Sequence, residues 1–523
     1  MVPSTIACTI AFGCIIMVIY YIAKRYLRNT RPIFPFPPGP PGLPWIGNVI
    51  GIDTDAPWLT YRDWARTYGD IVRSRLLGKD IIIINSEMMA KELLDNHSRN
   101  NSDRPYFITN DLCGLDFNSA LMPYGDRWRL HRRFFHQTFR GDAVQRFLPF
   151  QHVKACQFLL QLFNTPTQLD EHIFGYTSSV ILKSTYDYDP PSQDDELIKI
   201  VAKVQEIALS LVRPDVAIII STFPTLLKLP AWFPGMSFKT EMAIARKLTR
   251  QYVETAFEYS LKRVRDCSIT SSMVHDAIQT MEAKGTVPDE LWLKGLKGLK
   301  DAAATAFLAA SETSHSVLMT FFLLMVLNPA AQEKAQAQID AVVGKDRLPT
   351  MDDRPLLPFI DAIFREILRY SPVVPLFPHA ALDDDVYRGF YIPKGAILIA
   401  NLWSMAHDET RYPNPHSFIP ERFLNDDGSL KPNDTEHIAF GFGRRICVGR
   451  HFADTSVWAV IANVLAVFKI LRPLDENGVE IPVEPKFTTG LGIRPLPFQC
   501  RIVPRMPGMD GEKLEELIAA SAI

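Results

Sequence analysis

The residues Phe440-Gly441-Phe442-Gly443-Arg444-Arg445-Ile446-Cys447-Val448-Gly449 form the stretch that decides the interpretation of this chain. Five of them match the pattern FxxGxRxCxG, namely Phe440, Gly443, Arg445, Cys447 and Gly449. Two glycines permit a tight loop, because glycine adopts left-handed backbone conformations at little cost. Backbone N–H groups in such a loop can point at the sulfur of Cys447, and Arg445 adds positive charge nearby. Both effects favour a thiolate, so we expect the pKa of the Cys447 thiol to be lowered.

A thiolate in this setting has a specific chemical use. It can serve as the axial ligand of a haem iron, where it pushes electron density toward the metal. The competing interpretation is a structural cysteine buried in a turn, because cysteine is among the most buried residue types. A chance match to the whole pattern, however, has a probability on the order of one in ten thousand at average residue frequencies. The spacing therefore favours an iron ligand.

Composition places the chain among globular proteins and excludes several classes of function. The chain has 523 residues, of which 47% are hydrophobic and 22% charged, so its bulk is not disordered. Lys and Arg number 56 against 58 Asp and Glu, and this lack of a basic excess argues against nucleic-acid binding. The seven cysteines are odd in number and widely spaced, without a CxxC. This pattern argues against both a disulfide framework and a zinc site.

The first residues predict a membrane anchor. Thr5 to Ala23 contains no charged residue, and as a helix it would measure roughly 28 Å, close to the ~30 Å of a bilayer core. Four basic residues follow it, at Lys24, Arg25, Arg28 and Arg31. The positive-inside tendency then places the rest of the chain in the cytosol. A cleaved signal peptide is the alternative, although its basic region would come first.

The body after the anchor is mostly helical in pattern, with a few short strands. Ile71 to Leu77 and Ile81 to Asn85 flank Gly78-Lys79-Asp80, which is typical of an antiparallel hairpin, and Ala396 to Leu402 is a further strand. We expect three parts: an anchor over 1–23, a basic flank and proline-rich hinge over 24–48, and one domain over 49–523.

Three helices stand out in the body. Asp289 to Leu327 contains no proline and predicts a helix of about 58 Å, which must cross the whole body. A second helix opens at Asn328-Pro329 and ends near Gly344, because proline suits the first helical position. A third runs from about Pro358 to Tyr370 and stops before Pro372.

Two more motifs lie between that long helix and the cysteine loop. Glu366-Ile367-Leu368-Arg369 fits ExxR, and Pro420-Glu421-Arg422-Phe423 reads PERF. ExxR alone is weak evidence, since ion pairs three residues apart usually lie on solvated helix faces. Together with the cysteine loop, the motifs resemble the cytochrome P450 family, and the resemblance extends to about Arg505. It implies a mainly α fold with a small antiparallel β region, and a network of Glu366, Arg369 and Arg422 that locks the haem-binding core.

The resemblance also implies how the cofactor is held. Cys447 would be the axial ligand of the iron of haem b. The other implied cofactor-binding residues are Trp128, Arg132, His379, Arg445, Phe440, Gly443 and Gly449. Trp128 and Arg132 match the family's WxxxR, and Arg132, His379 and Arg445 would bind the propionate carboxylates. An arginine suits this role because its fork bonds both oxygens of a carboxylate. Outside the family pattern, His379 would be interpreted as an ordinary histidine.

The segment from Ala309 to Ser314 matches the family's oxygen-binding motif, [AG]-G-x-[DE]-T-[ST], with Ala310 in place of the usual glycine. Thr313 can bond the carbonyl of Ala309, four residues back, and open a groove in the helix. The resemblance implies that Glu312 and Thr313 are catalytic and relay protons during oxygen activation. The alternative is a solvated glutamate and a threonine bonded to its own helix.

Two further regions concern the membrane and the substrate. Val216 to Phe238 is strongly apolar but interrupted by prolines, so it is either buried core or a lip that dips into the membrane interface. It resembles the family's substrate-entry region. Three stretches lie where the family lines its pocket, namely Arg104 to Ser119, Val373 to Phe377 and Thr488 to Leu491. They are mainly apolar, as expected for a lipophilic substrate.

The resemblance implies a monooxygenase that uses O₂ and electrons from NADPH, delivered by an NADPH-cytochrome reductase. Four residues are candidates for the docking face, Arg129, Arg133, Arg444 and Arg450. Short stretches resemble fungal microsomal enzymes of secondary metabolism, which implies an endoplasmic reticulum membrane protein with a cytosolic catalytic domain, acting in secondary metabolism or xenobiotic oxidation. Two alternatives stay open: an isomerase or dehydratase of the same fold that needs no external electrons, and a membrane-anchored haem or sterol carrier without catalysis.

Overall fold

The computed structural model describes residues 32–521, except 193, 212–213, 269–270, 284–287 and 433–435. The anchor predicted over 1–23 and all four basic residues that follow it lie outside the described residues.

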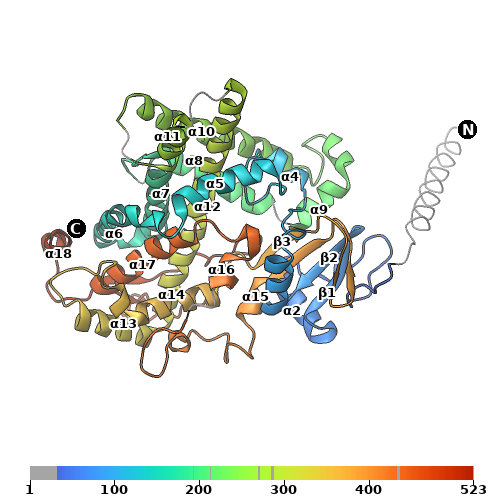
Figure 1. Cartoon of the computed structure of the whole chain (residues 1–523). Coiled ribbons are helices and arrows are strands. Elements are labelled where there is room, and N and C mark those ends of the chain that lie inside the picture. The colour runs from blue at the N-terminus through green and yellow to red at the C-terminus, as the bar shows by residue number, and fades with distance from the viewer. Residues whose placement is uncertain are drawn as a thin grey trace, which may run out of the picture.

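The fold is mainly helical, with small sheets at its edges (Figure 1). The helices are α2 (Pro57–Tyr68), α3 (Glu87–Ala90), α4 (Ile108–Leu112), α5 (Asp126–Phe139), α6 (Leu148–Asn164), α7 (Leu169–Tyr186), α8 (Glu196–Leu211), α9 (Pro214–Thr222), α10 (Phe238–Arg265), α11 (Met273–Glu282), α12 (Asp289–Leu327), α13 (Pro329–Val342), α14 (Pro358–Tyr370), α15 (Leu402–Ala406), α16 (Glu436–Phe440), α17 (Arg450–Val467) and α18 (Gly511–Ala520). Short helical turns used below are the π-helical η2 (Lys91–Asn96) and the 3₁₀ turns η5 (Pro224–Lys228), η7 (Pro420–Phe423) and η8 (Gly443–Arg445).

Helix α12 is the central element of the fold. Its 39 residues have the bounds that the sequence predicts, Asp289 and Leu327. Two acidic residues in its first turn suit the positive end of the helix dipole, and Pro329 starts the next helix. In Figure 1 it passes behind α5 and runs down the middle of the molecule, where it packs against α5, α7 and α17. Among the described residues it is the one helix whose length and composition would suit a membrane span, but most of that stretch is buried in the protein.

The largest sheet has the strand order β1-β2-β6-β3. Its strands are β1 (Ile71–Leu76), β2 (Lys79–Ile84), β3 (Leu376–Ala380) and β6 (Ile397–Asn401). The β1–β2 hairpin is tighter than predicted, because the turn is Leu77-Gly78 with φ of 48° and 83°, and two positive φ values are typical of a two-residue hairpin turn.

The expectation of a purely antiparallel β region is wrong at one place, because β2 and β6 pair in parallel. Most of the helices lie between these two strands in the chain, so no short turn fixes their direction. The remaining pairs are antiparallel: β1 with β2, β3 with β6, β4 (Asp385–Tyr387) with β5 (Phe390–Ile392), and β7 (Phe468–Leu471) with β8 (Arg501–Pro504).

The apolar segment over 216–238 consists of short pieces and contains no spanning helix. It comprises the end of α9, the turn η5 and an irregular stretch up to α10. Ala217 and Ile218 pack into a cluster with the large sheet. Phe223, Trp232 and Phe233 are exposed. The segment therefore divides its side chains between the core and the surface.

Candidate active site

The cysteine loop lies between α16 and α17. The backbone N–H of Cys447 donates to the carbonyl of Phe440, at 2.8 Å, which closes the loop. The backbone N–H groups of Gly449 and Arg450 donate toward the Cys447 sulfur. Both belong to the start of α17, whose dipole also favours a negative sulfur. The loop thus aims its N–H groups at the thiol, as the sequence predicts.

The expected lowering of the thiol pKa is wrong for the protein chain by itself. Burial raises the pKa of Cys447, and this effect outweighs the two N–H groups and the charges of Arg132 and Arg450, which lower it. The surface of Cys447 is nevertheless accessible. The sulfur is thus surrounded by protein, yet part of the side chain is not covered. The sequence could not give the sign of the shift, because desolvation depends on distant segments.

Gly443 is required by a close approach of two segments. Its φ is +60°, and a Cβ atom there would lie 1.9 Å from the carbonyl oxygen of Leu94. The backbone N–H of Gly443 donates to the carboxylate of Asp95. Both partners belong to η2, a π-helix, an element that is frequently found at functional sites. Asp95 was not among the residues predicted from the sequence.

Two arginines flank the indole of Trp128, which lies on α5. The guanidinium carbon of Arg445 is 4.6 Å from the ring centroid and that of Arg132 is 5.9 Å from it. Arg132 donates to the carbonyl of Ile446, at 2.6 Å. Arg445 donates to three carbonyls, those of Ser102, Ser119 and Met122. The structure therefore brings Trp128, Arg132 and Arg445 together beside the cysteine loop.

A third arginine, Arg104, is buried and lies near Arg445. It donates to the carbonyls of Ala120 and Pro378, at 2.8 and 2.6 Å, and its guanidinium lies 4.1 Å from the ring centroid of Phe377. The sequence placed Arg104 at the start of a pocket-lining stretch and missed this basic role. The sequence alone does not reveal this role, because the partner Pro378 comes from a segment far along the chain.

His379 lies next to these arginines on β3. Its Nδ1 is 2.8 Å from the carbonyl of Asn101, whereas its buried Nε2 has no partner among the described residues. Burial, and next to it the charge of Arg104, keeps the pKa of His379 well below its usual range. A buried ring nitrogen without a protein partner is free to bond a water or an atom of a bound ligand.

The three arginines, Arg104, Arg132 and Arg445, lack a carboxylate partner among the residues that the structure describes; all their hydrogen bonds there go to carbonyls. Burial lowers the pKa of Arg132 and of Arg445 to about 10. Asp103 acts on Arg104 and Arg445 through its charge without contacting them. Unpaired buried charges are costly, so this group fits an anionic ligand, and the two carboxylates of a haem meet that requirement.

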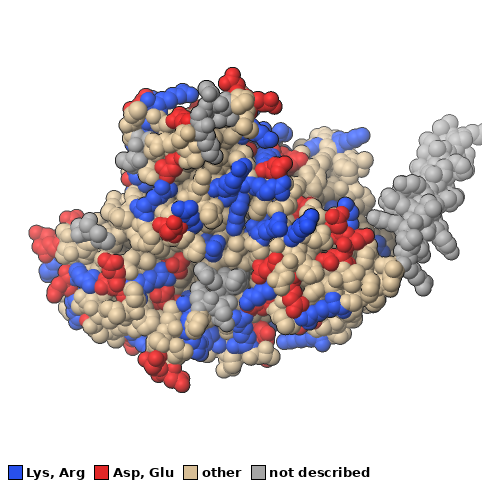
Figure 2. Space-filling view, in the orientation of Figure 1, with Lys and Arg blue, Asp and Glu red and all other residues tan. Residues whose placement is uncertain are grey.

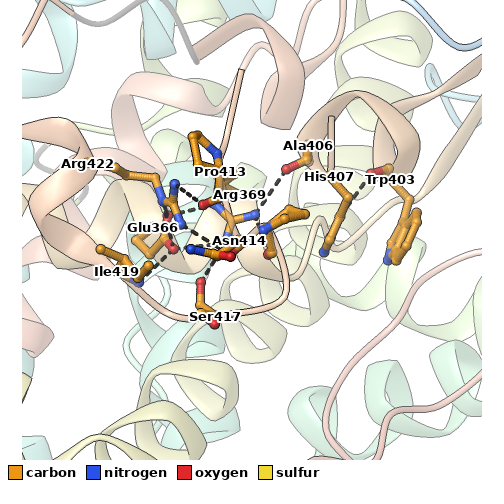
Figure 3. Close-up of polar contacts among 11 residues, drawn as sticks. Glu366, Arg369, Trp403, Ala406, His407, Pro413, Asn414, Ser417, Ile419 and Arg422 are labelled. Atoms are coloured by element: carbon orange, nitrogen blue, oxygen red, sulfur yellow. Dashed lines mark hydrogen bonds and ion pairs between the residues drawn. The ribbon is translucent and has the colours of Figure 1, made fainter. Parts of the chain in front are cut away.

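The Glu366–Arg369–Arg422 network forms as the sequence predicts (Figure 3). Arg369 donates to both oxygens of Glu366, at 2.7 and 2.8 Å, and Arg422 donates to the same carboxylate, at 3.2 Å. Glu366 is 0% exposed. Arg369 also donates to the carbonyls of Ala406, Pro415 and Ser417. One buried pair on α14 thus fixes the irregular chain that leads to η7 and the cysteine loop.

The oxygen-binding motif lies in the middle of α12. Thr313 donates to the carbonyl of Ala309, at 2.9 Å, as the sequence predicts. Gln205 of α8 donates to the carbonyl of Leu308, and Thr177 of α7 to that of Ser311. These side chains share the carbonyls with the helical N–H groups at this point, and α12 remains a continuous helix with Ala310 present.

Glu312 has a partner that the sequence did not predict. Its Oε1 lies 3.4 Å from Nη1 of Arg494, which belongs to a hairpin near the C-terminus. The structure does not bring Glu312 or Thr313 into contact with the three arginines beside the cysteine loop, since no hydrogen bond joins them in the described part of the chain. The site therefore has two separate polar parts, one at the cysteine loop and one on α12.

Comparison with known proteins gives the same class of protein that the residues of the site indicate. The family model described as Cytochrome P450 matches residues 37–501. Cytochrome P450 monooxygenase ple1 from Rhodocybe pseudopiperita is 37% identical to this chain, over 92% of the chain and 91% of that protein. Cytochrome P450 monooxygenase claR from Ampulloclitocybe clavipes is 36% identical, over 96% and 92%. Cytochrome P450 monooxygenase COX1 from Coprinopsis cinerea is 34% identical, over 96% and 98%.

The chain belongs to the cytochrome P450 family. Its relatives are named monooxygenases, so it is an oxidoreductase that incorporates oxygen from O₂. The family implies a haem-iron cofactor and a redox partner.

A first prediction concerns the buried network. Glu366→Ala leaves Arg369 as an uncompensated buried charge, which typically costs about 3–5 kcal/mol of unfolding free energy. The matched control is Glu421→Ala, because Glu421 lies beside Arg422 but pairs with Lys334 at the surface, at 2.8 Å with both side chains about half exposed. Such pairs contribute about 0–1 kcal/mol. Urea unfolding and haem content of the purified variants measure the difference, and equal losses in both would contradict the assigned role of the buried pair.

Proposed function

We propose that this chain is a haem b monooxygenase that inserts one oxygen atom from O₂ into a lipophilic small molecule, with electrons from NADPH through a cytochrome reductase. The observation that carries the proposal is the group of buried arginines and His379 beside the accessible Cys447. The arginines have no carboxylate partner among the described residues, and they lie next to a cysteine whose sulfur accepts N–H groups of its own loop. Such a site suits a ligand with two carboxylates and a metal. Haem b has these features, and when bound it supplies the activation of O₂.

The chain's own residues would then have distinct tasks. Cys447 would hold the iron through its sulfur, while Arg104, Arg132, Arg445 and His379 would bind the carboxylates. The aromatic face of Trp128 would keep two guanidiniums in place. The Glu366 network would hold the preceding chain rigid, so that the loop keeps its shape without the cofactor.

The polar residues on α12 would supply the protons. Thr313 is bonded to Ala309 and still exposed, so its hydroxyl can also serve a ligand. Glu312 is an acid one residue earlier on the same helix. General acid catalysis by positioned groups typically contributes ~10²–10⁴-fold to a rate. We assign Glu312 and Thr313 to this relay.

Attachment to the endoplasmic reticulum membrane is part of the proposal. The charge-free stretch from Thr5 to Ala23 would be a single-pass anchor, with the catalytic domain in the cytosol. Exposed aromatic side chains at Phe223, Trp232 and Phe233 support a second, shallow contact with the membrane interface. A membrane-bound enzyme would meet a lipophilic substrate where such molecules accumulate.

A basic surface supports the reductase as partner. Figure 2 shows Lys and Arg side chains gathered on the middle of one face, over α5. Arg129 and Arg133 are exposed residues of that helix, and Arg444 in the cysteine loop is also exposed. An acidic partner docked there would lie close to Cys447, and charge complementarity mainly increases the association rate.

The named relatives come from fungi, which supports a role in fungal secondary metabolism or xenobiotic oxidation. Glu312-Thr313 supports an oxygen-activating enzyme over an isomerase or dehydratase of the same fold, since such relatives tend to lose this pair.

The iron ligand is tested with two cysteine variants of the full-length protein. Cys447→Ala should lose the carbon monoxide absorption band that thiolate ligation gives to reduced haem. Cys500→Ala is the matched control, because Cys500 is a partly buried thiol in the C-terminal region and should keep the band. Extraction of the bound haem and its mass identify haem b. A normal band from Cys447→Ala would show that another group binds the iron.

The reaction is tested with isotopically labelled O₂. The full-length protein, a cytochrome reductase and NADPH are supplied with terpenoid, indole and polyketide compounds, and products are analysed by mass. A monooxygenase places one labelled atom in the product and consumes NADPH only with substrate present. Product formed without NADPH would favour the isomerase or dehydratase, and a bound compound without any product would favour the carrier.

The anchor is tested by deletion of residues 1–23. The truncated protein should move toward the soluble fraction and keep its haem, because the deleted stretch contributes apolar length and no site residue. Residual membrane binding should fall further when Trp232→Ser and Phe233→Ser are added. Membrane fractionation and haem content are measured together. A truncated protein that cannot hold haem would mean that the segment is more than an anchor.

A further inference from the structure

A hairpin near the C-terminus reaches the acid on α12. Its two arms are joined by an isolated β-bridge between Phe487 and Pro495. Thr488 donates its N–H to the carbonyl of Arg494 at 2.8 Å and accepts the Arg494 N–H on its hydroxyl at 3.0 Å. The N–H of Ile493 donates to the carbonyl of Val373, at 2.8 Å. The backbone of Arg494 is therefore fixed from both sides.

The guanidinium of Arg494 extends from this hairpin to Glu312. The separation of 3.4 Å is longer than the ~2.7–2.9 Å of a strong charge-assisted hydrogen bond. Arg494 is 39% exposed and Glu312 only 15% exposed. The contact is thus a loose ion pair with its basic partner toward solvent. A loose pair restricts the carboxylate and still allows it to turn.

Two more ionisable groups lie at the same place. Nε2 of His315, three residues beyond Glu312 on α12, is 3.1 Å from Asp170 of α7. The Asp170 side chain is 63% exposed, whereas His315 is 1% exposed. The hydrogen bond from His315 lowers the pKa of Asp170, and the charge of Arg494 lowers it further. Arg494 therefore acts on two carboxylates, since it contacts Glu312 and interacts with Asp170 through its charge.

We propose that Arg494 is a positioning residue, which holds the Glu312 carboxylate in the orientation that returns protons from solvent to Thr313. This inference rests on the proposed function, in which Glu312 relays protons. In each cycle Glu312 gives one proton inward, becomes a carboxylate paired with Arg494, and regains a proton from water. The hairpin that carries Arg494 also includes Thr488 to Leu491, the stretch predicted to line the pocket. The same hairpin would therefore hold both the residues of the pocket wall and the residue that positions Glu312.

The test uses the full-length haem protein with reductase, NADPH and a compound that the labelled-O₂ assay shows to be oxidised, and measures hydrogen peroxide formed per NADPH oxidised. A half-exposed pair changes a population by roughly 2- to 5-fold, so Arg494→Ala should raise the peroxide yield by about that factor. Arg494→Lys keeps the charge and should restore most of the normal yield. Lys486→Ala is the matched control, because Lys486 lies on the same hairpin but pairs with the exposed Glu484.

A second measurement tests the ion pair without depending on turnover of the enzyme. Amide hydrogen exchange over residues 487–495 should accelerate in Arg494→Ala and equally in Glu312→Gln, because each removes one half of the same pair. Lys486→Ala should leave the exchange unchanged. All variants must keep the carbon monoxide spectrum, which shows that the cysteine loop is intact.

The outcomes separate the two proposals. If Glu312→Gln leaves the peroxide yield unchanged, the relay assigned to Glu312 is wrong, and the role of Arg494 falls with it. If Glu312→Gln raises the yield and Arg494→Ala does not, the relay stands and the inference about Arg494 is overturned. A raised yield in Arg494→Ala that Arg494→Lys fails to lower would also overturn it, because the positive charge would then not be the cause.

Discussion

The buried positive charge beside Cys447 is the constraint on which the active site depends. Arg104 and Arg132 come from the first third of the chain and Arg445 from the distant cysteine loop, and each uses its hydrogen-bond donors on backbone carbonyls. Carbonyl dipoles reduce the cost of burying a guanidinium but do not cancel its charge. Asp103 supplies one negative charge nearby, so two more would balance the group. The two carboxylates of haem provide that number, and binding the cofactor would thereby also stabilise the fold around it.

The buried charges of Glu366 and Arg369 differ from those of the three arginines, because they neutralise each other within the chain. Their role is structural: the remaining donors of Arg369 go to carbonyls of a stretch with little regular structure between β6 and η7. Such a stretch has buried carbonyls that no strand partner can satisfy. The guanidinium satisfies several of them at once, which explains why the network has to be buried and cannot be a surface ion pair.

The sequence predicted the features that depend on residues close together in the chain. The bounds of α12 follow from the proline-free run that ends at Asn328-Pro329, and the Thr313–Ala309 bond follows from their spacing. Three features could not be predicted, because each depends on contacts between distant segments. These are the parallel pairing of β2 with β6, the basic role of Arg104 and the partner of Glu312. The sign of the Cys447 pKa shift belongs with them, since burial is a property of the whole fold.

The two polar parts of the site differ in how firmly their side chains are held, and the difference suits the tasks proposed for them. Around the cysteine loop the contacts are short and buried, and the Gly443 backbone lies so close to Leu94 that no side chain fits. A cofactor held there keeps one position through many turnovers. On α12 the acid is held by one long contact to a partly exposed arginine. A proton donor must lose and regain its proton in each cycle, and it could not do so if its carboxylate were fixed as firmly as that of Glu366. The weak contact at Glu312 is therefore what a proton relay requires.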